Sequence, residues 1–396
     1  MSRADGPPVG LVVDCSGVGA GGITRVLTEL VRHWPAGWRL DLVAAPAAWS
    51  VPSRAGGAEV TVLSGQGNGR AGTIAAATTA LRRATGRAGA TTVLSLSPSA
   101  AVLGSRLPVV TVLHDLAFRL WPYELPASVR RYRQVSYGTA IRRSHRLVCV
   151  SARTRHDLLG LYGVPPARAH VWHPGSDLAV PAAGPPASSL PAVGLPAGPA
   201  AGGPPATGLP EPLARLAERG ERYLLVAGHA PHKGVEIAVD ALPRLPGHSL
   251  AVLTGGQPAE RFRDAAARST ARDRIHFLDR LPDAGYAAAL AHAAVFLMPS
   301  HFEGYGLPAA EALRLGTPTV VSPDPALHEA TGGRAVRMTA WSAEALVAAV
   351  TAAERAARPV PGYGGRSWRE ATAELAAFLG ELSTVDRRPA PARAGG

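Results

Sequence analysis

Short apolar segments alternate with helical patterns along most of the chain, and this alternation is the strongest constraint on the fold. Segments such as 9–13 and 109–113 are apolar without interruption, which is typical of strands buried on both faces of a sheet. Between them lie amphipathic stretches such as 23–34 and 129–143. The sequence therefore predicts an α/β protein with parallel sheets covered by helices. The other strand-like runs are 40–44, 93–96, 147–150, 223–227, 250–253, 275–278, 295–298 and 319–321.

The alternation is interrupted once, at 181–210, where Pro, Ala, Gly, Ser and Leu make up almost every position. Such a composition favours an extended or disordered linker, and 396 residues exceed what one hydrophobic core usually serves. We expect a first domain, a linker insertion, a second domain, a C-terminal helix for which a return to the first domain is left open, and a disordered tail. Their predicted bounds are 1–178, 179–220, 221–366, 367–386 and 387–396.

Charge and cysteine content limit the expected binding partners and the expected cellular location. The net charge is +12, from 41 Lys and Arg against 29 Asp and Glu, and it favours anionic partners without choosing among phosphates, nucleic acid and a membrane surface. Cys15 and Cys149 each lie in a strand-like run, which favours two buried, reduced thiols. The first apolar run is too short for a signal sequence or a membrane span. We therefore expect a cytoplasmic protein.

A basic stretch covers one helical pattern and the residues just after it. Its usual meaning is a solvated helix face; the alternative is contact with the inner face of the membrane or with an anionic lipid acceptor. The stretch consists of Arg130, Arg131, Arg133, Arg142, Arg143 and Arg146.

The most informative motif, at 301–311, follows the strand-like run 295–298. Two glycines open a tight turn, and Pro308 suits the first position of a helix. The backbone N–H groups of Gly306 and Leu307 would then face outward at the positive end of the helix dipole. A phosphate is the usual ligand of such a site.

Two glutamates belong to the same motif. Glu311 lies one turn into the predicted helix, where its carboxylate can accept hydrogen bonds from ribose hydroxyls. The structural alternative is an acid that stabilises the helix N-terminus, although Pro308 stands where a capping box would need Ser or Thr. We expect Glu311 to bind ribose and Glu303 to take part in the reaction.

The spacing of these glutamates, with the Gly-x-Gly-Leu-Pro turn and the following segment 316–321 (Gly-Thr-Pro-Thr-Val-Val), resembles the retaining glycosyltransferase family 4. The resemblance implies the GT-B fold, with two Rossmann-like domains whose parallel sheets face an interdomain cleft. It implies transfer of a sugar, a mannose-type hexose being favoured, from a nucleoside-diphosphate donor to a hydroxyl acceptor. Glycolipid, polysaccharide and natural-product acceptors all stay open. The leaving diphosphate would help to remove the acceptor proton, without a metal or cofactor.

Two segments of the first half resemble further landmarks of the family. The segment 16–25 is similar to its glycine-rich first loop, and implies that the backbone at Gly21 and Gly22 approaches the donor and acceptor. His114 and Asp115 resemble a His-Asp pair at the end of a strand. The resemblance implies that the histidine approaches the donor sugar, whereas a lone histidine is more often structural.

The segment 225–234 resembles the loop in which family members place an arginine and a lysine against the donor diphosphate. Lys233 matches and is the only lysine in the chain. Its ammonium would stabilise the charge that grows on the leaving group. The arginine is absent, and His229 and His232 occupy the loop instead; a neutral imidazole lacks the charge and the bidentate geometry of a guanidinium.

Two other function classes stay open at this point. A non-catalytic relative that binds nucleotide sugars is favoured by the missing arginine. A Rossmann oxidoreductase that uses NAD(P) would want Gly-x-Gly-x-x-Gly at the first turn and an acid about 20 residues beyond, whereas here the strongest anion motif lies in the second half. No sequence cluster has metal-ligand spacing, so we expect an enzyme that needs no metal. The composition favours a bacterial source, and we expect no nucleic-acid partner.

Overall fold

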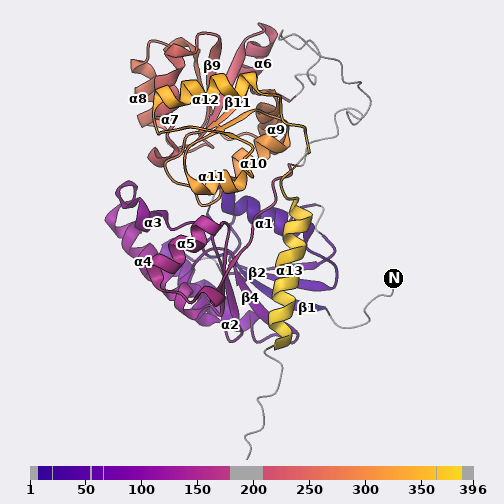
Figure 1. The fold of residues 1–396 in the computed structure, drawn as a ribbon. Coiled ribbons are helices and arrows are strands. Elements are labelled where there is room, and N and C mark those ends of the chain that lie inside the picture. The colour runs from indigo at the N-terminus through magenta and orange to yellow at the C-terminus, as the bar shows by residue number, and fades with distance from the viewer. Residues whose placement is uncertain are drawn as a thin grey trace, which may run out of the picture. The chain divides into compact units, whose positions relative to one another are not determined.

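The computed structural model describes residues 8–19, 21–53, 56–65, 67–178, 208–362 and 364–385. The chain forms two compact units (Figure 1). Unit 1 is built from Met1–Gly175, Glu303–Leu307 and Arg366–Gly396, and unit 2 from Ser176–Phe302 and Pro308–Gly365. Each unit has its own sheet and its own hydrophobic clusters.

Within the described residues, unit 1 contains one parallel sheet of seven strands in the order β3-β2-β1-β4-β5-β6-β7. The chain order reverses between the neighbouring strands β1 and β4, which makes the carboxyl ends of these strands a topological switch point, the usual place for a ligand in open α/β sheets. The strands are β1 (Val9–Asp14), β2 (Trp38–Val43), β3 (Glu59–Leu63), β4 (Ala90–Ser95), β5 (Val109–Leu113), β6 (Arg146–Cys149) and β7 (Ala169–Val171).

Helices cover both faces of this sheet, because every strand residue points to the face opposite its neighbour's. Leu11 and Val13 of β1 pack in one cluster with Leu27 of α1, whereas Val12 packs in another with Leu81 of α2. The helices of unit 1 are α1 (Gly22–His33), α2 (Gly69–Ala84), η1 (Ala100–Gly104), α3 (Ala117–Leu120), η2 (Pro122–Glu124), α4 (Ala127–Arg143), α5 (Ala152–Tyr162), η3 (Pro166–Arg168) and α13 (Trp368–Val385).

The last helix, α13, is part of unit 1, although it is the end of the chain. Trp368 is completely buried, and the indole N–H of Trp172 donates to the carbonyl oxygen of Ala371 at 2.8 Å. Gly175 has no room for a side chain, because a Cβ there would lie 2.3 Å from the backbone nitrogen of Trp368. The helix expected at 367–386 thus completes the core of the first unit.

Among the described residues, unit 2 contains a parallel sheet of six strands in the order β10-β9-β8-β11-β12-β13. Its switch point lies between β8 and β11. The strands are β8 (Arg222–Ala227), β9 (His248–Leu253), β10 (Ile275–Leu278), β11 (Val295–Met298), β12 (Thr319–Val321) and β13 (Val336–Arg337).

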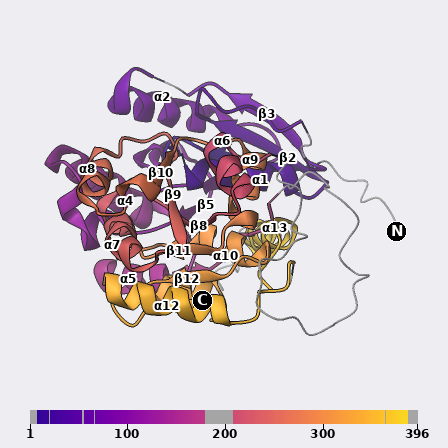
Figure 2. The same cartoon turned by 90° about the horizontal axis from the view of Figure 1, so that it is seen from above.

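The two faces of this second sheet are also covered, with α7, α8 and α12 on one face and α6 and α9 on the other (Figure 2). Leu224 and Val226 of β8 belong to the first cluster, and Leu225 between them belongs to the second. The helices are α6 (Glu211–Glu218), η4 (Pro231–Lys233), α7 (Val235–Ala241), η5 (Leu242–Arg244), α8 (Glu260–Arg268), η6 (Arg272–Arg274), α9 (Asp283–His292), α10 (Leu307–Arg314), α11 (Pro325–Ala330) and α12 (Ala343–Arg355).

The structure corrects the end of the predicted linker. Residues 208–220 contain α6, whose Leu213 and Leu216 are buried in a cluster of unit 2. The sequence did not predict this helix, because the Pro-, Ala- and Gly-rich composition of the preceding segment made the whole region resemble a linker. The rest of the predicted linker, 179–207, and the predicted tail, 387–396, lie outside the described residues. In the part of the chain that the structure describes, no helix is both long enough and apolar enough to cross a membrane.

The docking of α13 can be tested with Leu375→Ala. Leu375 is 1% exposed and lies in the cluster that α13 shares with α1. Removing a buried leucine side chain costs its transfer free energy and leaves a cavity, so we expect the free energy of unfolding to fall by about 2–5 kcal/mol, measured by urea denaturation. Leu103→Ala is the matched control, because Leu103 is 59% exposed. Equal losses in the two variants would contradict the docking.

Candidate functional site

A buried carboxylate holds the switch point of unit 1 together. Asp14, at the end of β1, is inaccessible and accepts hydrogen bonds from the backbone N–H and the hydroxyl of Ser16 and from the hydroxyl of Ser95 on β4. Burial raises the pKa of Asp14, and the serine hydrogen bonds oppose this increase. Ser16 also donates to the hydroxyl of Ser99 at 2.7 Å. This cluster was not predicted; the signal in the sequence is a polar residue that ends an apolar strand.

The glycine-rich loop follows directly. Gly21 has a φ of 115° and precedes the first residue of α1, Gly22. Both glycines are exposed, and no atom lies within 4 Å of the position that a Cβ would occupy on either. The hydroxyl of Thr24 donates to the carbonyl of Gly19 at 2.6 Å and holds the turn. An open helix N-terminus with small residues allows a ligand to approach the backbone closely.

His114 follows β5, and its ring is partly exposed. Its Nε2 lies 2.8 Å from the carbonyl oxygen of Leu96. Because a carbonyl can only accept, Nε2 carries the hydrogen. Burial lowers the pKa of His114, so the neutral ring dominates near pH 7 and its Nδ1 is an acceptor.

Asp115, which the family resemblance predicts to bind the donor, makes a structural contact in this fold. One of its carboxylate oxygens accepts a hydrogen bond from the backbone N–H of Ala117 at 2.9 Å, at the start of the short helix α3. This contact orients the segment that follows His114.

The segment Glu303–Leu307 belongs to unit 1. The carbonyl oxygen of Gly304 accepts hydrogen bonds from the hydroxyls of Ser151 at 2.5 Å and Thr154 at 3.1 Å. A Cβ on Gly304 would lie 1.8 Å from the carbonyl oxygen of His114. Glu303 is buried at 7% exposure. The structure therefore brings the segment that carries Glu303 against His114, which sequence spacing alone could not show.

Tyr305 belongs to the same segment, and its ring stacks on that of His173, with 5.7 Å between the ring centroids. Gly306 follows with a φ of 104° and Leu307 begins α10. The turn expected before this helix is therefore present, with glycine where the backbone needs a positive φ.

In unit 2, Lys233 lies in the loop after β8, next to the loop after β11. Its side chain packs on Gly228, where a Cβ would lie 2.4 Å from the Cβ of Lys233. The backbone N–H of His301 donates to the carbonyl oxygen of His232 at 2.7 Å. Gly234 has a φ of 65°, and a Cβ there would lie 2.3 Å from the carbonyl oxygen of Pro299. The lysine loop and the loop leading to α10 are thus held together at the switch point of unit 2.

Glu311 is almost completely buried on α10, at 1% exposure, and one of its oxygens accepts a hydrogen bond from the hydroxyl of Tyr286 at 2.7 Å. Tyr286 lies on α9 and was not predicted, because nothing in its local sequence distinguishes it from a core tyrosine. The hydrogen bond fixes one carboxylate oxygen in place.

His229 is exposed in the turn after β8. Among the described residues, no three His, Cys, Asp or Glu side chains are grouped in a way that could hold a metal ion.

Comparison with known proteins identifies the family. Residues 20–180 match the family model for Glycosyltransferase Family 4, and residues 221–354 match that for Glycosyl transferases group 1. The chain belongs to glycosyltransferase family 4. The solved structure of Anabaena HepE in complex with UDP and glucose resembles this family 4 chain with a TM-score of 0.65 at 15% identity, covering 96% of this chain and 98% of that one. This likeness confirms the predicted α/β fold of the GT-B class.

Two curated relatives show what family members with similar sequences do. The D-inositol 3-phosphate glycosyltransferase of Kribbella flavida is 27% identical over 248 residues, which are 61% of this chain and 50% of the relative. The MMP alpha-(1->4)-mannosyltransferase of Mycolicibacterium hassiacum is 35% identical over 111 residues, 27% of each protein. The chain spans about half the length, or less, of these two relatives.

The contact between Gly304 and His114 can be tested with Gly304→Ala. A methyl group cannot fit 1.8 Å from a backbone carbonyl oxygen, so residues 303–307 must shift. We expect the free energy of unfolding to fall by about 1–3 kcal/mol in urea denaturation. Gly160→Ala is the control, because Gly160 lies within α5 with open space around it; this variant should be unchanged or slightly more stable. A Gly304→Ala protein as stable as the wild type would show that the contact is not tight.

The lowered pKa of His114 predicts that the free energy of unfolding depends on pH. Its pKa is lowered from the ordinary 6.5 in the folded protein, so the unfolded chain takes up this proton first as the pH falls through about 6.5. The stability that the neutral ring contributes is complete above that pH and is lost below it. From about pH 8 to about pH 5, the wild type should lose more unfolding free energy than His114→Gln, whose amide can still donate to Leu96. Parallel curves for the two proteins would contradict the neutral state of the His114 ring.

Proposed function

We propose that this family 4 chain transfers a hexose from a nucleoside-diphosphate donor to a hydroxyl acceptor, with retention of the anomeric configuration. The observation that carries the proposal is the hydrogen bond between His301 and His232, which joins the lysine loop to the loop before α10. Parallel α/β sheets bind phosphorylated ligands at such switch points.

Two kinds of group would bind the donor diphosphate. The backbone N–H groups of Gly306 and Leu307 lie at the start of α10, where the helix dipole favours an anion. The ammonium of Lys233 would stabilise the negative charge that develops as the diphosphate leaves. Backbone contacts fix the loop that carries Lys233, which reduces the reorganisation needed during the reaction.

The ribose would be bound by Glu311. Tyr286 holds one of its carboxylate oxygens at 2.7 Å, which orients the carboxylate for ribose hydroxyls. Because the side chain is buried, a hydroxyl that reaches it leaves water and gains a charge-assisted hydrogen bond.

In unit 1, the neutral ring of His114 can accept a hydrogen bond from a sugar hydroxyl through Nδ1, and Glu303 lies in the segment packed against it. We infer that these residues position the sugar. The acceptor proton goes to an oxygen of the leaving diphosphate, and no side chain serves as a nucleophile. Neither a metal nor a cofactor takes part. A mannose-type hexose is supported by the relative named a mannosyltransferase.

A second candidate is a binding protein that has lost turnover. It is favoured by the exposed His229, which stands in the loop where the family has a clamp arginine. A panel of nucleotide sugars would separate the two in a thermal-shift screen, since a ligand at about a hundredfold its Kd adds about 2.7 kcal/mol of stability. Stabilisation without donor hydrolysis or transfer to any acceptor would favour the binding protein. The oxidoreductase alternative loses its support, because both halves of the chain match glycosyltransferase models.

Lys233→Gln tests the proposed role of the ammonium. Removing one electrostatic contact to developing charge costs about 10²–10³ in kcat, and we expect a loss of this size with a smaller change in donor KM. Because Lys233 is the only lysine, a lysine-directed acylating reagent followed by mass spectrometry also reports on this side chain. A bound donor should slow its acylation.

The matched control is Arg272→Gln. Arg272 is exposed in η6, just before the amino end of β10 and so at the edge of the unit 2 sheet opposite to Lys233. Its loss should change kcat less than about twofold. Full activity in Lys233→Gln, or acylation of Lys233 that the donor does not slow, would overturn the assignment.

A further inference from the structure

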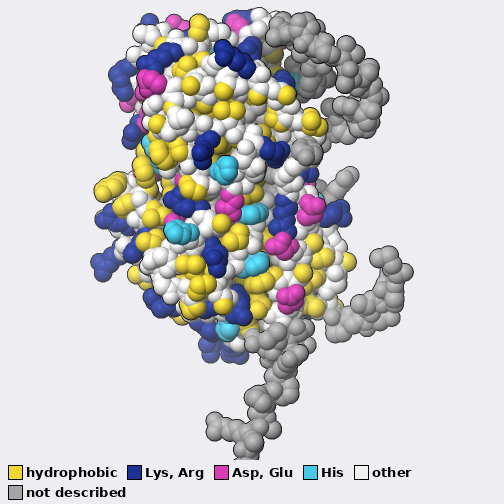
Figure 3. All heavy atoms as spheres, viewed as in Figure 1, with side chains coloured by type: hydrophobic (Ala, Val, Ile, Leu, Met, Phe, Trp, Pro, Cys, Tyr) yellow, Lys and Arg dark blue, Asp and Glu magenta, His cyan; other side chains and the backbone are white. Residues whose placement is uncertain are grey.

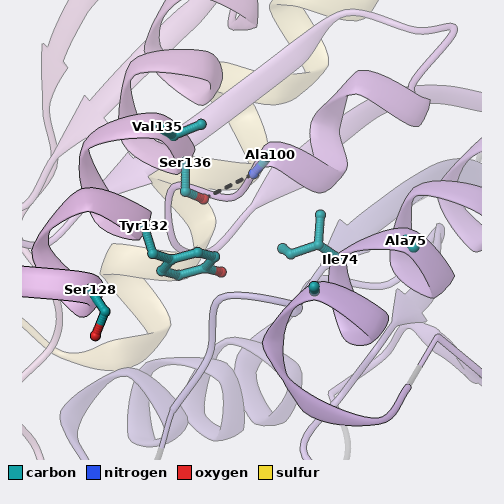
Figure 4. Close-up of a pocket in the computed structure, with 8 residues that line it drawn as sticks. Ile74, Ala75, Ala100, Ser128, Tyr132, Val135 and Ser136 are labelled. Atoms are coloured by element: carbon teal, nitrogen blue, oxygen red, sulfur yellow. Dashed lines mark hydrogen bonds between the residues drawn. The ribbon is translucent and has the colours of Figure 1, made fainter.

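Unit 1 contains a groove of about 510 Å³ that none of the donor-binding residues uses (Figure 4). Its walls come from α2, η1 and α4, and we call it the α2–α4 groove. Ile74 and two alanines of α2 face Tyr132 and Val135 of α4, and Ala100 of η1 closes one side. Its volume lies within the range of sites that hold small ligands, and its lining is predominantly apolar.

Exposed apolar side chains also occur on the elements that form the groove and in the segment before α4. Val135, on its wall, is 61% exposed, and Leu103 of η1 is 59% exposed. Tyr123, shortly before α4, is 93% exposed, and Leu120 is 36% exposed. Apolar groups gathered around an open groove leave water when a partner covers them.

The same part of the chain is strongly basic. Residues 117–143 contain six arginines and one acid, Glu124. Arg131 is exposed on α4, one turn before Val135. Yellow and dark blue side chains lie together along the edge of unit 1 where Figure 1 labels α3 and α4 (Figure 3). Arginine next to exposed apolar and aromatic side chains is typical of surfaces that bind anionic lipids.

We propose that the α2–α4 groove holds an acyl chain of an anionic lipid and that the arginines of α4 bind its phosphate, which makes a lipid the acceptor class. This inference rests on the proposed glycosyl transfer and adds the acceptor to it. The occupant follows from the two chemistries that the surface combines, since an apolar groove alone would take an uncharged ligand and a basic helix alone would take a free phosphate.

The groove is connected to the predicted reaction site through η1. The backbone N–H of Ala100 donates to the hydroxyl of Ser136 on α4 at 3.1 Å. The preceding residue, Ser99, receives a hydrogen bond from Ser16 of the glycine-rich loop at 2.7 Å. Because η1 follows β4 and His114 follows the neighbouring strand β5, the groove lies at the same edge of the sheet as His114. A chain in the groove would bring its headgroup towards that edge.

The test measures binding of the full chain to vesicles by flotation and to dihexanoyl phosphatidylglycerol, a short-chain soluble lipid, by calorimetry. Vesicles of phosphatidylcholine with phosphatidylglycerol should bind the wild type at least tenfold more tightly than phosphatidylcholine alone. Val135→Asp and Ala75→Trp should each weaken binding of the soluble lipid at least tenfold, because the first places a carboxylate at the groove and the second fills it. Val360→Asp is the matched control, since Val360 is an equally exposed valine of unit 2.

The outcomes separate this inference from the proposed function. A wild type that binds a nucleotide sugar but neither lipid probe overturns the groove assignment alone. A wild type that binds the lipid probes but no nucleotide sugar overturns the glycosyl transfer and leaves lipid binding in place. Vesicle binding that Ala75→Trp and Val135→Asp leave unchanged, with no binding of the soluble lipid, shows surface electrostatics only and also overturns the inference. Circular dichroism confirms that both variants fold.

Discussion

The hydrogen bond from the backbone N–H of His301 to the carbonyl oxygen of His232 holds together the two loops at the switch point of unit 2. Adjacent parallel strands end at one edge of a sheet, but their loops are held in a fixed relation only where further contacts join them. Gly234 makes this approach possible, because any side chain there would collide with Pro299. The two contacts fix the backbone of the loop that carries Lys233.

In unit 1, a buried carboxylate joins the ends of two neighbouring strands. Asp14 connects β1 and β4 through Ser16 and Ser95 at the point where their loops separate. Removing a carboxylate from water is unfavourable, which is why the pKa of Asp14 is raised, and three hydrogen bonds offset this cost. The result is a rigid base for the glycine-rich loop. The same cluster includes Ser99, which accepts a hydrogen bond from Ser16 and directly precedes η1, one wall of the α2–α4 groove.

Much of this architecture could be predicted from the sequence because strand runs and glycine turns are local signals. The apolar runs located the central strands, and the pattern at 301–311 predicted both the turn at Gly306 and the helix that begins at Leu307. Long-range contacts could not be predicted in this way. Tyr286 meets Glu311 only because α9 and α10 pack on the same face of a sheet, and no spacing in the sequence encodes that pairing.

Lys233 is the only lysine in a chain that otherwise uses arginine at its Lys and Arg positions. Its Cβ and Cγ pack on Gly228, directly after β8, and arginine has the same two atoms, so the difference between the two residues lies in the head group. An aliphatic stem with a compact ammonium delivers a concentrated positive charge, whereas a guanidinium spreads its charge over a broad plane and needs room for its fork. His229, in the same loop, is exposed. In the proposed reaction, Lys233 and the N-terminus of α10 would share the stabilisation of the charge on the departing diphosphate.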